Sequence, residues 1–254
     1  MLRVVAGIAL IVVAVAALVF GGMAFWLLAA VMALLMMGEW ADLAKMPPQT
    51  RRLAQYALFV PLAIFSPFAA GPDFFALGLL LGAAFFIVIV TKRPILGWGI
   101  FYCGLPVFAL LLIRETPGNG VVFAFWALAL VWATDIGAYA AGRAIGGPKL
   151  APAISPNKTW AGLGGGVLAA ALLGITLHYS HGLPLRLTLA SPLLGVVAQG
   201  GDLFESWLKR RAGVKDSGAI LPGHGGVLDR LDGLVPVAPL AALLVLIPIR
   251  ELLG

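Results

Sequence analysis

The sequence predicts an all-α fold, a polytopic membrane bundle of about nine transmembrane helices. Of its 254 residues 61% are hydrophobic and only 11% charged, with a mean hydropathy of +1.03, whereas soluble domains carry about 25% charged residues. Apolar runs long enough to cross a bilayer, about 17 to 25 residues, recur along the whole chain. We therefore expect one integral membrane domain, with N-terminal helices in residues 1–130 and a second half in residues 131–254.

Charged residues, glycines and prolines separate the nine apolar runs. The expected spans are 4–20, 23–38, 53–70, 74–91, 95–113, 120–141, 160–180, 188–208 and 233–250. Arg3 before the first run allows a signal peptide, but a second apolar run follows after only Gly21 and Gly22, which disfavours cleavage. Cys103 is the only cysteine, so an intramolecular disulfide and a cysteine-based metal site are excluded.

The basic residues alternate in density from loop to loop. Across nine spans, fourteen of the 17 Lys and Arg residues fall on the side of the N-terminus, and Arg114, Arg186 and Arg250 fall on the other. Basic loops stay in the cytoplasm, so the N-terminus is expected inside and the C-terminus outside. The net charge of +6 then reflects topology and anionic lipid rather than nucleic acid.

Charge is concentrated near the C-terminus. Of the 17 basic and 11 acidic residues, nine lie between Glu205 and Asp232. Cations and carboxylates mixed around a glycine-rich loop suit a phosphate ligand that carries a divalent metal, because the cations neutralise phosphate oxygens and the carboxylates hold the ion.

One helix face of the eighth span is polar. Asp202, Glu205, Ser206 and Lys209 are spaced i, i+3, i+4 and i+7, so they share a face. If Lys209 marks the interface, Asp202 lies about 10 Å deeper at about 1.5 Å per residue, where a carboxylate needs a metal or a cationic partner. The alternative is an ion pair that only fastens two helices.

A second carboxylate pair precedes the ninth span. Asp229 and Asp232 are spaced i, i+3 and share a face if a helix begins near Val227. We expect Mg²⁺ to be bound by Asp202 and Asp229, since this ion uses one or two carboxylates with waters and substrate phosphates. A solvated helix N-terminus is the alternative for Asp229 and Asp232.

The loop between these helices contains Pro222, Gly223, His224, Gly225 and Gly226. Its glycines permit positive φ angles and let backbone amides approach an anion closely. His224 is the only histidine in a charged setting. Glycine-rich loops are often simple turns, so the flanking charge carries the interpretation.

Residues 135–159 form a third group. Asp135, Tyr139 and Arg143 recur on one face at the end of the sixth span, and the segment that contains Lys158 is expected to begin the seventh. Its hydroxyls and lysine favour a polyphosphate cradle, although Ser155-Pro156 fits a helix start with proline in the first turn. In the first half, Glu39, Trp40 and Asp42 are interpreted as membrane-interface residues.

The second half resembles the phosphatidate cytidylyltransferases, also called CDP-diacylglycerol synthases. The long signature of that family is met by Ser206, Lys209, Arg210, Lys215, Asp216, Gly218, Leu221, Pro222, His224, Gly225, Gly226, Asp229, Arg230 and Asp232. The residues around Asp202, from Asp135 to Arg143 and from Ser155 to Thr159 are also similar to the family. The resemblance covers about residues 132–250, and the first half matches only as an apolar region.

The resemblance implies transfer of the cytidylyl group of CTP to phosphatidate, with CDP-diacylglycerol and pyrophosphate as products. It implies Mg²⁺, a monovalent cation such as K⁺ beside it, and a bacterial inner membrane; a homodimer is a further expectation. Catalysis is assigned to Asp202, Lys209, Asp229, Arg230 and Asp232. Substrate binding is assigned to Arg143, Ser155, Asn157, Lys158, Thr159, Ser206, Arg210, Lys215, Asp216, His224, Gly225 and Gly226. Asn157 and Ala161 depart from the family, which commonly has a basic residue and a Glu there.

Three other functions are compatible with a polytopic chain of this composition. A transporter usually binds near the midplane between internal repeats, whereas the charge here lies near one edge. A CDP-alcohol phosphatidyltransferase lacks support because Asp232-Gly233 is followed by Leu234-Val235-Pro236 rather than that family's pattern. A related cytidylyltransferase that acts on another lipid phosphate stays open.

Overall fold

The computed structural model describes residues 2–219 and 225–247, with side chains from residue 11 onward. Its elements in chain order are α1 (Leu2–Phe20), α2 (Gly22–Leu43), α3 (Pro48–Ile64), α4 (Phe74–Thr91), α5 (Pro94–Arg114), α6 (Gly120–Ile145), β1 (Lys149–Ala151), β2 (Ser155–Thr159), α7 (Trp160–His181), α8 (Leu185–Ala212), α9 (Leu228–Leu231) and α10 (Leu234–Leu246). A helix lies over each of the nine predicted spans. This confirms the all-α class, as expected for apolar runs that must satisfy their backbone groups internally in lipid.

The predicted count of nine membrane crossings is not confirmed. Within the described residues, six helices are long and apolar enough to cross a bilayer: α2, α4, α5, α6, α7 and α8. The helix over the third predicted span has 17 residues and begins earlier than predicted, so its first turns include Arg51 and Arg52. The described part of α10 has 13 residues.

The chain forms two compact units. The first contains residues up to Leu112 together with Leu208–Leu231, and the second contains Ile113–Trp207 together with the residues from Asp232 onward. The C-terminal segment that contains α9 therefore belongs to the same unit as the N-terminal residues up to Leu112.

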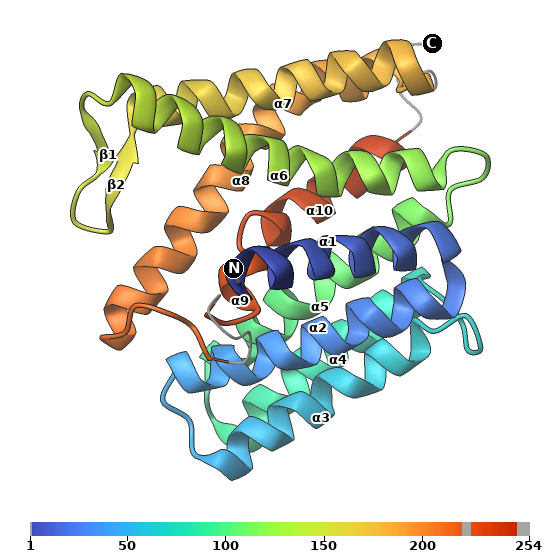
Figure 1. Cartoon of the computed structure of the whole chain (residues 1–254). Coiled ribbons are helices and arrows are strands. Elements are labelled where there is room, and N and C mark those ends of the chain that lie inside the picture. The colour runs from blue at the N-terminus through green and yellow to red at the C-terminus, as the bar shows by residue number, and fades with distance from the viewer. Residues whose placement is uncertain (1, 220–224, 248–254) are drawn as a thin grey trace. The chain divides into compact units, whose positions relative to one another are not determined.

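In the first unit, α1 to α4 pack as successive neighbours (Figure 1). Two indoles join helices that are distant in sequence: Trp26 Nε1 donates to the Leu62 carbonyl at 2.7 Å, and Trp40 Nε1 donates to the Ile95 carbonyl at 2.8 Å. The Trp40 ring also packs on Tyr102, with centroids 4.8 Å apart. The end of α2 is thus fixed against α5, and the same helix contacts α9.

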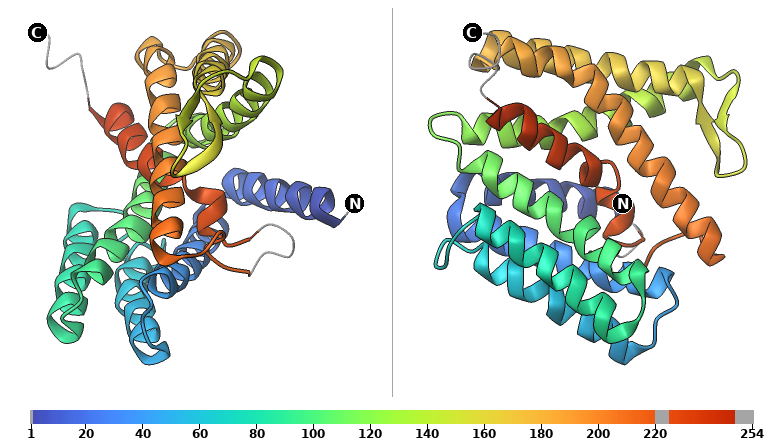
Figure 2. Two further views of the ribbon diagram at one scale, coloured as in Figure 1. Left: turned by 90° about the vertical axis from the view of Figure 1, so that its left-hand side faces the viewer. Right: turned by 180° about the vertical axis from the view of Figure 1, so that it is seen from behind.

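In the second unit, α6 and α7 run side by side, and both ribbon views show the β1–β2 hairpin at their shared end (Figures 1 and 2). Small residues allow this approach: a Cβ on Gly137 would lie 2.5 Å from the Ala169 Cβ and 2.6 Å from the Gly165 carbonyl oxygen. Close packing of small residues is a common way for membrane helices to associate. Trp126 Nε1 donates to Ser191 Oγ at 2.9 Å and holds α6 to α8.

Two local predictions are corrected. Ser155-Pro156 does not begin a helix, because Ser155–Thr159 is a strand antiparallel to β1 and α7 begins only at Trp160. Asp229 and Asp232 do not lie on one continuous helix from Val227, because the four-residue α9 and a turn at residues 232–233 precede α10. Pro156 suits an extended segment, and Asp232 Oδ1 accepts from the Gly233 amide at 2.7 Å, which favours the turn before α10.

Candidate active site

The predicted site residues fall into two groups, one in each unit. In the first unit, Lys209 at the end of α8 and Asp229 in α9 meet in a loop cluster. In the second unit, Asp202 in α8 lies with Lys158 from β2 and with Asp232. Each group contains a carboxylate paired with a lysine.

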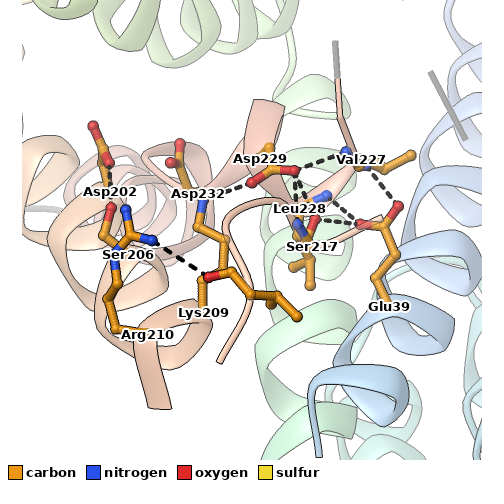
Figure 3. Close-up of polar contacts among 12 residues, drawn as sticks. Glu39, Asp202, Ser206, Lys209, Arg210, Ser217, Val227, Leu228, Asp229 and Asp232 are labelled. Atoms are coloured by element: carbon orange, nitrogen blue, oxygen red, sulfur yellow. Dashed lines mark hydrogen bonds and ion pairs between the residues drawn. The ribbon is translucent and has the colours of Figure 1, made fainter. Parts of the chain in front are cut away.

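Asp229 is held by four donors (Figure 3). Lys209 Nζ donates to Asp229 Oδ1 at 2.6 Å, and the two side chains are only 13% and 7% exposed. Asp229 Oδ2 accepts from the Gly226 amide at 2.7 Å and from the amide and the hydroxyl of Ser217, both at 3.0 Å. The Asp229 carboxylate is therefore fixed in orientation from both sides.

The ionised form of Asp229 is favoured by this arrangement. Burial alone raises the pKa of a carboxyl group, but the hydrogen bonds from Lys209, Gly226 and Ser217 outweigh it and hold the pKa of Asp229 below its usual value. An anionic oxygen beside a lysine is what a phosphate-transfer site needs to hold a cation or to orient a cationic side chain.

The glycines of the loop admit these contacts. Gly225 has φ +79°, and a Cβ there would lie 2.7 Å from Asp229 Oδ2. The sequence analysis expected these glycines to let amides approach an anion. In the structure, the anion next to Gly225 and Gly226 is the chain's own Asp229 carboxylate. His224 lies outside the described residues, as do Leu221 and Pro222.

Asp202 pairs with Lys158 in the second unit. Lys158 Nζ lies 2.5 Å from Asp202 Oδ2 and also contacts the Gln199 carbonyl at 3.5 Å. Ser206 Oγ lies 3.4 Å from Asp202 Oδ1, so the predicted shared face of α8 is present. The cationic partner expected for a carboxylate in this span is thus Lys158, from the hairpin rather than from another helix.

Asp232 lies beside Asp202 because two glycines bring their backbones together. A Cβ on Gly201 would collide with the Asp232 carbonyl oxygen, and a Cβ on Gly233 would lie 3.3 Å from the Ala198 carbonyl oxygen. Burial and the negative charges of Asp202 and Glu205 raise the pKa of Asp232 well above its usual value. Crowded carboxylates of this kind repel each other until a cation neutralises them.

The donor chemistry fits a hard divalent cation. Mg²⁺ takes one or two protein carboxylates and completes its shell with waters and phosphate oxygens, and Asp202 and Asp232 supply two carboxylates in the second unit. In residues 2–219 and 225–247, no group of three or more His, Cys, Asp or Glu side chains is arranged to hold a metal by itself. Asp202 and Asp232 therefore suit an ion that completes its coordination with oxygens of the substrate phosphates.

The hairpin group forms in part as predicted. Arg143 Nη1 donates to the Tyr139 hydroxyl at 3.1 Å, which confirms the shared face in α6. Thr159 is buried, and its Oγ1 accepts from the Gly162 amide at 3.0 Å as the N-cap of α7. Thr159 therefore orders the junction, whereas Asn157 is exposed and Ser155 is half-buried.

The remaining predicted residues lie at the surface of the first unit. Arg210, Lys215, Asp216 and Arg230 are exposed, and Arg210 Nη1 lies 3.5 Å from the Val214 carbonyl. Their positions suit contact with a charged ligand arriving from water, and their assigned roles stay predictions.

Sequence reasoning missed Glu39 and Ser217. Glu39 and Trp40 were interpreted as interfacial, but their exposed fractions are 1% and 4%. Only Asp42, which pairs with Arg51 at 3.0 Å, keeps a partly exposed side chain. The available signal was a carboxylate inside an apolar run, which is costly to bury and marks a functional site by default.

These features define a class: a polytopic membrane protein whose lysine-carboxylate pairs and glycine-rich loop suit phosphate chemistry. The chain matches the cytidylyltransferase family over residues 1–247, and it belongs to that family. The family likeness thus also includes the N-terminal helices, which the sequence analysis had left outside it.

Three relatives illustrate the similarity, and each is named phosphatidate cytidylyltransferase. The protein of Brucella suis biovar 1 is 40% identical over 226 residues, which are 87% of this chain and 83% of the relative. The protein of Rickettsia felis is 33% identical over 201 residues, which are 74% of this chain and 88% of the relative. The protein of Bacillus subtilis is 44% identical over 141 residues, about half of each chain.

Proposed function

We propose that this protein transfers the cytidylyl group of CTP to phosphatidate and forms CDP-diacylglycerol and pyrophosphate for phospholipid synthesis. The observation that carries the proposal is the Lys209–Asp229 pair. The amides of Ser217 and Gly226 hold this pair from the segment between the end of α8 and Asp229, residues 213–229, which is called the signature loop. Membership of the cytidylyltransferase family and relatives named phosphatidate cytidylyltransferase support the substrate assignment.

The chemistry requires charge control more than a strong base. A phosphate monoester has a second pKa of about 6, so the phosphatidate phosphate is largely dianionic at neutral pH. Its oxygen attacks the α-phosphorus of CTP; the new O–P bond forms as the bond to the pyrophosphate oxygen breaks. The barrier is the repulsion between two polyanions, which fixed cations must reduce while they align the attacking and leaving oxygens.

The residues divide this work in the proposal. Lys209 and Arg230 face the phosphates and stabilise negative charge that develops in the transition state. Asp202 and Asp229 are the proposed Mg²⁺ ligands, with Asp232 beside Asp202. Bound Mg²⁺ would neutralise phosphate oxygens and make pyrophosphate a better leaving group. A monovalent cation such as K⁺ stays a further proposal.

Nucleotide binding is proposed for the hairpin region. Lys158 offers a compact charge and Arg143 a planar fork for the phosphates of CTP. Lys158 presently neutralises Asp202, so a cation at Asp202 would let this ammonium turn to a phosphate. Ser155, Asn157 and Thr159 complete the proposed cradle. Ser206, Arg210, Lys215, Asp216, His224, Gly225 and Gly226 are proposed to contact the substrates around the signature loop.

The location of the substrates follows from their solubility. Phosphatidate keeps its acyl chains in the bilayer, and CTP is cytosolic, so we propose that the active site faces the cytoplasm of a bacterial inner membrane. Six helices of membrane-crossing length among the described residues support a multi-pass protein. We further propose that the protein is a homodimer, and crosslinking in native membranes would measure its oligomeric state.

One assay tests the function. Purified protein is incubated with CTP, Mg²⁺ and a panel of lipid phosphates, and pyrophosphate and the lipid product are measured. Product with phosphatidate supports the proposal. Product only with another lipid phosphate assigns a related cytidylyltransferase, and no nucleotide-dependent product from any lipid would overturn the enzymatic assignment and leave a transporter as the alternative.

A further inference from the structure

Glu39 at the end of α2 is a buried carboxylate bound to the signature loop. Its side chain is 1% exposed. Glu39 Oε1 accepts from the Val227 amide at 2.8 Å. Glu39 Oε2 accepts from the Leu228 amide at 2.8 Å and from the Ser217 hydroxyl at 2.9 Å (Figure 3). A buried carboxylate is very costly without such donors, so these contacts are what makes burial of Glu39 possible.

The loop residues that bind Glu39 also hold Asp229. Val227 and Leu228 directly precede Asp229, and Ser217 contacts it through both its amide and its hydroxyl. The Ser217 hydroxyl has one proton and lies 2.9 Å from Glu39 and 3.0 Å from Asp229. Ser217 therefore links the two carboxylates in one network, and Glu39 bonds both sides of the loop, through the Ser217 hydroxyl on one side and through the amides of Val227 and Leu228 on the other.

Two glycines make room for Glu39. A Cβ on Gly218 would lie 2.6 Å from Glu39 Oε1, and a Cβ on Gly226 would collide with Glu39 Oε2 and with Ser217 Oγ. Neither glycine has a positive φ, so steric space and not backbone freedom explains both. The small residues of the signature thus fit a carboxylate that lies about 180 residues earlier in the chain.

We propose that Glu39 is a positioning residue for cytidylyl transfer. It orders the backbone of residues 217–218 and 226–228, so that Asp229 stays oriented toward Lys209, whose Nζ lies 2.6 Å from Asp229 Oδ1. The inference rests on the function proposed above. Glutamine is a stringent substitution: its NH₂ group would face either the Val227 amide or the donors from Leu228 and Ser217, and a donor opposite a donor cannot bond.

Glu39→Gln tests this role in purified full-length protein reconstituted in lipid. We expect kcat to fall by about tenfold or more, with KM for CTP and for phosphatidate changed by less than about threefold, because Glu39 acts through Asp229 and not through substrate binding. Hydrogen exchange at the amides of residues 225–231 should accelerate, since two of their acceptors are weakened. This second measurement does not depend on activity.

Asp42→Asn is the matched control. It removes the same charge from the same end of α2, but Asp42 is partly exposed and pairs with Arg51 rather than with the loop. We expect wild-type kcat and wild-type exchange for this variant. A loss of activity in Asp42→Asn equal to that in Glu39→Gln would overturn the inference, because it would show a general effect of charge at the helix end.

Two further outcomes overturn the positioning role. One is a wild-type kcat in Glu39→Gln; the other is a reduced kcat with unchanged exchange at residues 225–231. If Glu39→Gln does not fold, Gly218→Ala decides, because it presses on Glu39 Oε1 without a change of charge and should show the same paired signature. A wild-type protein that is inactive with phosphatidate would refute the proposed function, whereas the exchange experiment would still report whether Glu39 orders the loop.

Discussion

At the residue scale, the carboxyl groups of Asp229 and Asp232 differ in pKa because their neighbours differ. Asp229 has a lowered pKa, because Lys209 and two amides outweigh its burial. Asp232 has a raised pKa, because burial and the charges of Asp202 and Glu205 act in the same direction. Asp229 and Asp232, three positions apart, thus have opposite electrostatic environments. The ionised form of Asp229 is anchored by its donors, whereas Asp232 needs a cation nearby to ionise.

Substitution of the proposed metal ligands is the direct test at this scale. Asp202→Asn and Asp229→Asn should each lower kcat by about 100-fold or more, because an amide does not replace the negative charge that a metal ligand supplies. Size-exclusion profiles in detergent should stay those of the wild type. Turnover near the wild-type rate in either variant would contradict the ligand assignment.

Individual residues show what the sequence could predict. The i, i+3, i+4, i+7 spacing placed Asp202 and Ser206 on one face of α8 without knowledge of the fold. Glu39 could not be assigned in the same way, because its partners Ser217, Val227 and Leu228 are about 180 residues away. Helical periodicity reports local neighbours only, and a contact of this kind depends on tertiary packing.

At the element scale, glycines determine how closely helices approach. Gly164 and Gly165 are neighbours in α7, but a Cβ on Gly165 would lie 2.7 Å from the Gly137 carbonyl oxygen and would collide with the Ala141 Cβ. A Cβ on Gly164 meets nothing within 4 Å. Alanine at Gly165 therefore tests helix packing, and alanine at Gly164 tests helix propensity alone.

Gly165→Ala should destabilise the protein by about 1 to 3 kcal/mol, the usual cost of overpacking. Gly164→Ala should be neutral or slightly stabilising, because alanine favours helix more than glycine does. Thermal unfolding in detergent measures both. Equal melting temperatures for the two variants would show that the α6–α7 contact is not tightly packed.

The hairpin provides the second prediction at this scale. Arg143→Ala should raise KM for CTP more than KM for phosphatidate if this region binds the nucleotide phosphates. Lys158→Ala should do the same and also lower kcat, because it leaves Asp202 without its 2.5 Å partner. Lys149→Ala, an exposed cation in β1, is the control and should change neither constant.

Equal increases in both KM values for Arg143→Ala would refute this division of roles and leave the reaction itself unaffected. The hairpin also shows a limit of the sequence analysis. Ser155-Pro156 suits the first turn of a helix, but the strand pairing of Lys149 with Thr159 and of Ala151 with Ser155 prevails. Such pairing depends on a register that no short pattern specifies.

At the scale of the whole molecule, the chemistry is shared between segments far apart in the chain. The first unit joins residues up to Leu112 with Leu208–Leu231, and the family match extends over residues 1–247. Apolar composition predicted the helices of the first half but not their role. Through Glu39, α2 bonds the signature loop, so the proposed positioning role gives this N-terminal helix a part in the proposed reaction.

Sidedness is the prediction that involves the whole chain. The distribution of Lys and Arg predicts that the signature loop lies in the cytoplasm and the residues before α6 outside. Val214 is 42% exposed, and Asn119 is exposed before α6, so each accepts a cysteine in a Cys103→Ala background. Cys103 itself is buried and free.

Spheroplasts and inverted membrane vesicles, treated with a membrane-impermeant thiol reagent, would measure the orientation. Val214→Cys should react only in inverted vesicles and Asn119→Cys only in spheroplasts, because each position faces one aqueous compartment. The reverse pattern would invert the topology and deny CTP access to Lys209 and Asp229. Three helices of membrane-crossing length, α6, α7 and α8, lie between Asn119 and Val214, so an odd number of crossings separates the two positions. Labelling of both positions from the same side would instead show an even number of crossings between them.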